Sequence, residues 1–200
     1  MTTGARRGAR CLIVGLDGAC WSLVDRFMEE GRMPFLSSLL AQGCRGALNS
    51  TTPPMTLPSW ASILTGCNPG KHGIFDFVQR IPGTWDLRFV DRRDRRTPGL
   101  HRILGDAGGT VACVAMPTTW PPEPLRGLCV AGFDSPVATS IDRTACSPPE
   151  LYEELHRRFG GLKFADFQET RTGPDWHMEA RSSLLAEIDR KERIGRWLLG

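Results

Sequence analysis

A short, uninterrupted apolar run near the N-terminus limits the folds open to this chain more than any other feature. The run covers residues 11–16 and stops at Asp17 and Gly18. Its lack of polar alternation indicates a strand covered on both faces, as in a parallel sheet with helices on either side. Because ligands bind at the carboxyl ends of such strands, we expect Asp17 to lie where a site could form.

Helical and extended patterns alternate along the rest of the chain. Apolar spacing, proline starts and glycine stops predict helices over 21–30, 34–42, 58–64, 98–106, 148–158 and 175–199. Buried strands are predicted over 110–115 and 127–131, a short strand over 47–51 and a hairpin over 85–90. This alternation predicts an α/β protein with a mainly parallel sheet and flanking helices.

Composition and charge favour an ordinary globular protein. The 200 residues, 40% of them hydrophobic and 24% charged, are enough for one domain with a substantial core. A net charge of +3 is too small to predict nucleic-acid binding. The arginine-rich stretch 92–96 is interleaved with Asp91 and Asp94, which favours a solvated loop, with a phosphate-facing patch as the alternative.

Cysteine usage points to a reducing compartment. The chain has seven cysteines, an odd number, and none forms a Cys-x-x-Cys pair, so neither a disulfide framework nor a zinc knuckle is indicated. The apolar run at 11–16 is too short to span a bilayer, and the basic N-terminus 1–10 has no apolar h-region of a signal peptide before it. We therefore expect a cytoplasmic protein without a membrane segment.

A threonine before a proline-initiated helix is the second candidate for chemistry. Thr56 lies two residues before Pro58, and the free N–H groups of a helix start favour an anionic phosphoryl group. A threonine hydroxyl becomes a nucleophile when a divalent cation lowers its pKa. The alternative for Thr56 is a structural helix cap, and the same alternative applies to Asp17.

The order and spacing of these motifs resemble the type I phosphodiesterase/nucleotide pyrophosphatase family of the alkaline phosphatase superfamily. The resemblance rests on Asp17-Gly18, Glu30-Gly-Arg-Met-Pro34, the Thr-x-Pro helix start, the stretch 65–74 that ends in His-Gly-Ile, and the proline-rich loop 117–124. It implies an alkaline-phosphatase-like sheet and two divalent metal ions, zinc in the family, with Asp17 and Thr56 as ligands. Thr56 would attack a small phosphate ester, forming a covalent phospho-threonine that metal-bound water hydrolyses.

The chain departs from the family pattern on the substrate side. Phe77 occupies the position where the family has an asparagine that holds a phosphate oxygen, and a phenyl ring cannot donate that hydrogen bond. Asp76 is either a replacement polar group or a loop-capping carboxylate. We assign Leu57, Asp76 and Phe77 to substrate binding. The phenyl ring at 77 argues against nucleotide specificity and leaves a different phosphate ester or a sulfate ester open as the substrate.

The other metal ligands of the superfamily are missing. The four histidines belong to neither an Asp-x-x-x-His element nor an Asp-His pair, and His101, His156 and His177 are predicted to be surface residues. We therefore expect residues 11–200 to be the N-terminal part of a longer catalytic domain, incomplete at the C-terminus, after a flexible segment 1–10. Segments 75–97 and 116–147 would be loop-rich insertions on the substrate side.

Two competing hypotheses remain at this point. The first is a non-catalytic, truncated or degenerate homologue that binds phosphate or metal weakly at most. The second is an interaction module that uses the loop around Trp120. The enzyme hypothesis predicts metal-dependent phosphodiester cleavage that is lost in Thr56→Ala. The first alternative predicts no turnover with any metal, and the second predicts partner binding that is indifferent to Asp17→Asn.

Overall fold

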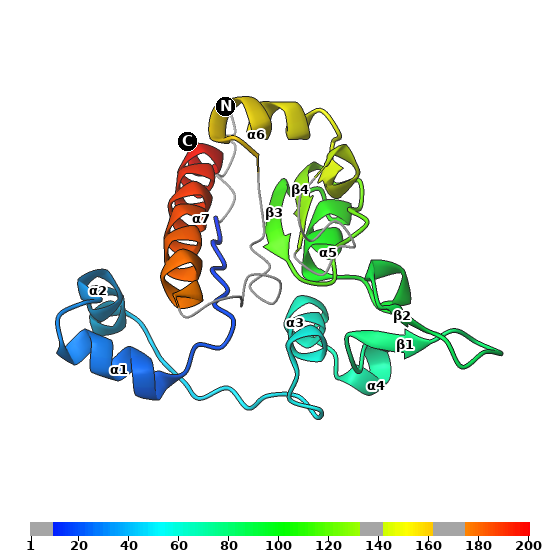
Figure 1. Ribbon diagram of the computed structural model, residues 1–200, viewed down its shortest axis with the longest axis horizontal. Helices are drawn as coiled ribbons and strands as arrows, with labels where there is room; N and C mark the ends of the chain where they lie inside the picture. The colour runs from blue at the N-terminus through cyan, green and yellow to red at the C-terminus, as the bar shows by residue number, and fades with distance from the viewer. Residues whose placement is uncertain (1–9, 133–141, 162–174) are drawn as a thin grey trace, which may run out of the picture. The chain divides into compact units, whose positions relative to one another are not determined.

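The computed structural model describes residues 10–132, 142–161 and 175–200. Most of the predicted flexible segment 1–10 and part of the loop-rich segment 116–147 lie outside these residues. The chain divides into two compact units, Met1–Asn49 and Ser50–Gly200. In the described residues the architecture is mixed α/β, with small sheets and several helices (Figure 1).

The first unit contains two helices, α1 (Trp21–Glu29) and α2 (Pro34–Gln42), which agree with the predicted ranges to within one residue. The segment after α2 is tied back to α1 by Arg45. Its Nη1 and Nη2 donate to the Asp25 carboxylate at 2.6 and 3.0 Å. The guanidinium also stacks on the Trp21 ring, 4.3 Å from the ring centroid. These contacts stabilise a helical pair that has little apolar burial of its own.

The predicted buried strand at residues 11–16 is not formed. The segment pairs with no strand among the described residues, and its four largest apolar side chains are 57–71% exposed. A buried parallel strand needs hydrogen-bonding neighbours on its edges and helices over both faces. The described part of the first unit supplies helices but no partner strand. The predicted strand at 47–51 is not formed either.

The second unit begins with two helices and a hairpin. Helices α3 (Thr56–Thr65) and α4 (Pro69–His72) are followed by the antiparallel strands β1 (Val78–Arg80) and β2 (Leu87–Phe89). The predicted hairpin is confirmed, although its first strand precedes the predicted range. One apolar cluster holds these elements together, formed by Leu57, Ala61, Ile74 and Val90, with the ring of Phe77 packed against it.

A three-stranded sheet follows in the order β3-β4-β5. Strands β3 (Val111–Met116) and β4 (Gly127–Ala131) are parallel, and they confirm the positions of the two predicted strands. Strand β5 (Cys146–Ser147) runs antiparallel to β4. The sequence does not predict it, because two residues are too few to show a strand period. The predicted helix before β3 forms as α5 (Leu100–Asp106).

The last two helices cover this sheet. They are α6 (Leu151–Phe159) and α7 (Trp176–Leu199), and both agree with the predicted ranges apart from shifts at their ends. Short 3-10 helices occur at Arg92–Asp94 and Arg143–Ala145. The second core joins α6, α7 and the sheet; its buried members are Val130, Ala131, Ala145, Cys146, Leu151, Leu155 and Ile194.

The seven cysteines are all free thiols, and they differ sharply in exposure between the units. Three exposed cysteines lie in the first unit, namely Cys11, Cys20 and Cys44. Three buried cysteines lie one on each strand of the three-stranded sheet, namely Cys113, Cys129 and Cys146. Cys67 has intermediate exposure.

Candidate functional site

Thr56 is the first residue of helix α3, so the helix starts two residues earlier than predicted. Met55 before it is extended, at φ −123° and ψ 157°, and its carbonyl accepts the Ser59 N–H at 3.0 Å. Pro58 has no N–H to donate. The amides of Thr56 and Leu57 are therefore the first-turn N–H groups with no acceptor in a preceding turn. Together with the helix dipole they favour an anion at this end of α3.

The apolar face of α3 anchors this helix start. Leu57, Trp60, Ala61 and Leu64 are buried. At the other end the left-handed Gly66, at φ +66°, closes the helix by donating its N–H to the carbonyl of the last turn at 2.8 Å. A residue with a side chain would adopt this φ only with strain, which explains a glycine there. Burial on one face leaves the half-buried Thr56 at the end of a firmly packed helix.

The three residues assigned to substrate binding have distinct surroundings. The Leu57 side chain is buried in the first core, the apolar cluster that it forms with Ala61, Ile74 and Val90. Only its backbone N–H is therefore available to a ligand. The exposed Asp76 caps its own loop, because its Oδ1 accepts the Phe77 N–H at 2.6 Å. The half-buried Phe77 ring packs against the cluster that contains Leu57.

Asp17 lies in an exposed turn of the first unit, followed by Gly18 at φ +67°. The cap position of α1 is occupied by Cys20, so Asp17 is not the N-cap residue of that helix. Thr56, Leu57, Asp76 and Phe77 all belong to the second unit, whereas Asp17 belongs to the first. The site that the sequence predicts thus draws on both units.

The described residues do not make up a metal centre. Within residues 10–132, 142–161 and 175–200, no three His, Cys, Asp or Glu side chains are grouped so that they could hold a metal ion. Catalytic zinc sites usually take three protein ligands. Asp17 and Thr56 would supply two protein ligands, which falls short of that number.

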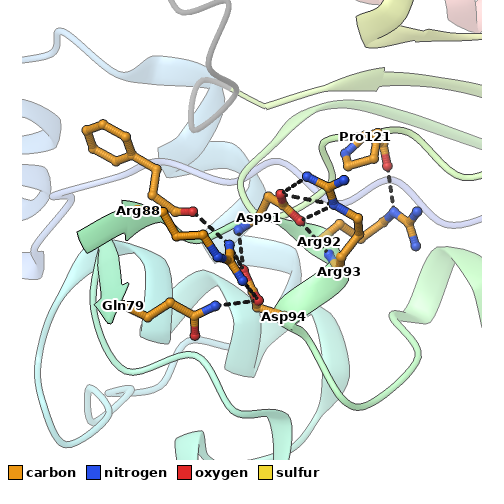
Figure 2. A network of polar contacts seen from close by, with 8 residues as sticks. Gln79, Arg88, Asp91, Arg92, Arg93, Asp94 and Pro121 are labelled. Atoms are coloured by element: carbon orange, nitrogen blue, oxygen red, sulfur yellow. Dashed lines mark hydrogen bonds and ion pairs between the residues drawn. The ribbon is translucent and has the colours of Figure 1, made fainter. Parts of the chain in front are cut away.

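Three arginines of the stretch 92–96, namely Arg92, Arg93 and Arg95, form ion pairs with carboxylates. Asp91 pairs with Arg93 at 2.6 Å and Asp94 pairs with Arg88 at 2.5 Å, and both pairs can be followed in Figure 2. Gln79 also donates to Asp94 at 2.5 Å. Burial is the largest single effect and raises the pKa of Asp94, but the hydrogen bonds from Arg88, the Asp91 backbone and Gln79, together with the charge of Arg88, outweigh it and lower that pKa. The prediction of a solvated loop holds only in part, because Asp91 and Arg95 are buried, whereas Arg93 is largely exposed and paired with Asp91.

The prediction that His101 lies on the surface is wrong. His101 is buried, and its Nε2 lies 2.8 Å from Oε2 of Glu123. Arg95 and Arg92 approach the same carboxylate at 3.3 Å each. The side chains of His101, Arg95 and Glu123 are only 4%, 2% and 13% exposed. The hydrogen bond from His101 lowers the pKa of Glu123. Burial acts in the opposite direction, and the positive charges of Arg92 and Arg95 lower this pKa further.

This buried cluster could not be found from sequence spacing, because Glu123 lies in the proline-rich loop far from α5. The other two surface predictions are confirmed, since His156 on α6 and His177 on α7 are exposed. A cavity of about 190 Å³ at the other end of α3 from Thr56 contains none of the predicted site residues; its lining is Ile63, Leu64, Thr65, Gly66, Leu100 and Ile103.

Comparison with known proteins places the chain. It matches the family model for type I phosphodiesterase / nucleotide pyrophosphatase over residues 11–197, and it therefore belongs to that family. The family implies phosphoester substrates, an alkaline-phosphatase-like fold and, typically, dependence on metal ions. No solved structure matches the chain. Among the described helices, none is both long and apolar enough to cross a membrane.

Proposed function

We propose that this chain carries the nucleophile of a phosphoester hydrolase of the phosphodiesterase/nucleotide pyrophosphatase type, and that the nucleophile is Thr56. The observation that carries the proposal is the position of Thr56 as the first residue of α3, beside first-turn N–H groups that have no helical acceptor. Family membership makes a phosphorus atom the natural target of a hydroxyl held there.

The proposed chemistry proceeds in two displacements. Oγ1 of Thr56 forms a bond to phosphorus as the bond to the leaving oxygen breaks, and the hydroxyl proton passes through solvent to the leaving group. Water then attacks the phospho-threonine, which releases phosphate or a phosphomonoester and restores the hydroxyl. The amides of Thr56 and Leu57 would donate to the non-bridging oxygens as negative charge develops.

The proposal extends to Asp17 as a ligand of one of two divalent ions, zinc by resemblance, with Thr56 as a further contact. Because the described residues do not complete such a centre, no step is assigned to the ions. The same proposal treats residues 11–200 as the N-terminal part of an alkaline-phosphatase-like domain with a mainly parallel sheet. Seven free cysteines support a cytoplasmic location for it.

Specificity follows from the residues beside α3. The Phe77 ring packs against the first core, and Asp76 is engaged with the loop backbone. Neither side chain supplies the amide donor that nucleotide pyrophosphatases of the family use. We therefore propose a small phosphate ester as substrate, bound through the backbone of Thr56 and Leu57 rather than through a side-chain amide.

The test is to trap the covalent intermediate. The protein is incubated with bis(p-nitrophenyl) phosphate and a divalent metal, quenched in acid and digested, and the peptide containing Thr56 is examined by mass spectrometry. The adduct is expected in the wild type and in Thr56→Ser, with turnover in Thr56→Ala reduced about 1000-fold or more. Thr65→Ala, at the other end of the same helix, is the matched control. Full activity of Thr56→Ala would remove the nucleophile assignment.

The second candidate is a non-catalytic homologue, favoured by the lack of a metal-ligating group among the described residues. It predicts neither adduct nor turnover with zinc, manganese or magnesium. The structure gives no support to an interaction module around Trp120. That side chain is half-buried against the second core, and its carbonyl accepts the Arg92 N–H at 2.7 Å.

A further inference from the structure

His72 is a fully buried histidine that the proposed chemistry does not use. It is the last residue of α4, and its backbone is held on both sides. The His72 N–H donates to the carbonyl of Asn68 at 3.1 Å, and its own carbonyl accepts the N–H of Arg96 at 2.9 Å. The imidazole is therefore presented from a fixed backbone rather than from a free loop.

The two ring nitrogens have different partners, which defines the tautomer. Nδ1 accepts the backbone N–H of Ile74 at 3.1 Å, so the proton of the neutral ring lies on Nε2. Nε2 lies 2.9 Å from Oγ of Ser62, and the ring also hydrogen-bonds the carbonyl of Pro58. Both of these partners belong to helix α3, in the turns that follow Thr56.

These hydrogen bonds reach one side of helix α3, and this location determines their effect on the position of Thr56. The apolar contacts pack α3 firmly against its neighbours but are non-directional, so they define its exact rotation less sharply than a directional bond does. A hydrogen bond from a fixed ring to one side of the helix is directional. Ser62 lies six residues from Thr56, about 9 Å along the axis at 1.5 Å per residue. A small error in helix orientation there would displace Thr56.

We propose that His72 is a positioning residue for Thr56, which it holds in place through Pro58 and Ser62 of helix α3. The inference rests on the proposed role of Thr56 as nucleophile, but its primary test does not depend on turnover. Only the neutral ring can both accept from Ile74 and donate to α3. Arg95 is the charged group facing the ring, whereas Pro58, Ser62 and Ile74 present uncharged groups.

Acid should therefore loosen the helix. Burial lowers the pKa of His72, with the Pro58 carbonyl opposing this effect and Arg95 adding to it. When α3 opens, the ring recovers an ordinary pKa near 6.5 and binds a proton more readily, so opening is favoured as the pH falls below that value. Hydrogen-exchange protection of the α3 amides should decline in this range, while that of the β3–β4 amides should not.

Two substitutions distinguish the contribution of Nδ1, which bonds Ile74, from that of Nε2, which bonds helix α3. His72→Gln keeps a donor that can reach Ser62 but loses the acceptor for Ile74, whereas His72→Asn keeps that acceptor and cannot reach α3. We expect His72→Asn to lower α3 protection about tenfold relative to β3–β4. His72→Gln should retain it and remove its pH dependence. Equal losses in both variants, or equal losses in helix and sheet, would overturn the inference.

Should His72→Asn fail to fold, the wild-type pH profile and its absence in His72→Gln decide the question alone. The rate of adduct formation at Thr56 supplies the functional readout. In His72→Asn we expect the rate of adduct formation to fall by at least the same factor as the protection of the α3 amides. In His72→Gln we expect this rate to stay close to that of the wild type. A wild type without any adduct would count against the proposed function only, because the exchange measurements would still show whether His72 holds α3.

Discussion

At the scale of single residues, the buried carboxylate of Glu123 has the largest predictable effect on stability. It faces Arg95, Arg92 and His101 with little access to water. Glu123→Gln keeps the shape of the side chain but leaves Arg95 with no counter-charge at that position. Removing one partner of a buried pair costs about 3–5 kcal/mol. We expect a loss of this order in the free energy of unfolding, measured by urea denaturation.

The control for this substitution is Asp106→Asn, which removes the partner of Arg102 in an exposed pair on α5. Exposed pairs of this kind contribute about 0–1 kcal/mol. Similar losses in the two variants would contradict the stabilising role of Glu123 as the buried counter-charge of Arg95.

The same carboxylate predicts an acid-sensitive component of stability. Its pKa in the folded protein lies below the ordinary value near 4.5, chiefly through the hydrogen bond from His101. Ionised Glu123 therefore stabilises the fold above about pH 4.5, and this contribution is lost as the pH falls through the lowered pKa. Urea denaturation between pH 6 and pH 3 should give a shallower acid limb for Glu123→Gln than for the wild type. Parallel curves would contradict this assignment.

At the scale of elements, the junction of β3 and β4 depends on a glycine. Gly127 starts β4 at φ +134°, and a Cβ there would lie 2.0 Å from the carbonyl oxygen of Val111 on β3. A side chain would break the pairing of the two strands. We expect Gly127→Ala to cost more than about 3 kcal/mol or to prevent folding, as shown by thermal unfolding.

Gly195 supplies the matched substitution in a helix. It lies inside α7, and a Cβ at this position would have no neighbouring atom within 4 Å. Gly195→Ala should therefore stabilise the protein by about 0.5–1 kcal/mol, since alanine restricts the unfolded chain and favours the helix. A destabilising Gly195→Ala would indicate that α7 is packed more closely at that position.

The elements also show which parts of the fold sequence reasoning reaches. The longer helices are predicted well because proline starts, glycine stops and apolar spacing are local signals, whereas the four-residue α4 is not predicted. The strand predicted at 11–16 is wrong, because a strand exists only with partners, and these are not encoded in its own residues. The surface prediction for His101 fails for a related reason, as its partner Glu123 lies in a distant loop.

For the candidate site, sequence reasoning reaches Thr56 and the helix start, both of which depend on neighbouring residues. It misses the role of His72 in holding α3, because a contact between Ser62 and His72 depends on how the turn around Gly66 folds back. The contribution of Asp17 stays a prediction, since it depends on how residues of two units come together. Long-range pairing is thus the information that a single sequence lacks.

At the scale of the whole molecule, the exposed run at 11–16 should control solubility. Apolar, unpaired segments of this kind promote association between chains. We expect wild-type protein to associate with rising concentration in light-scattering measurements, and Ile13→Glu to reduce this with less than about 0.5 kcal/mol change in stability. Leu48→Glu, at an isolated exposed leucine in the same unit, is the control. A loss of several kcal/mol in Ile13→Glu would instead show that the run is a buried strand.

The distribution of thiols gives the molecule an intrinsic probe of its own opening. Cys11, Cys20 and Cys44 are open to an alkylating reagent, and the Ser22 hydroxyl lowers the pKa of Cys20, which should react first. The thiols on β3, β4 and β5 can react only when the sheet separates. The mass of the protein, followed during alkylation, would therefore give two labelling rates, one for the exposed thiols of the first unit and one for the buried thiols of the sheet. The second rate reports how often the sheet opens, and no engineered cysteine is needed.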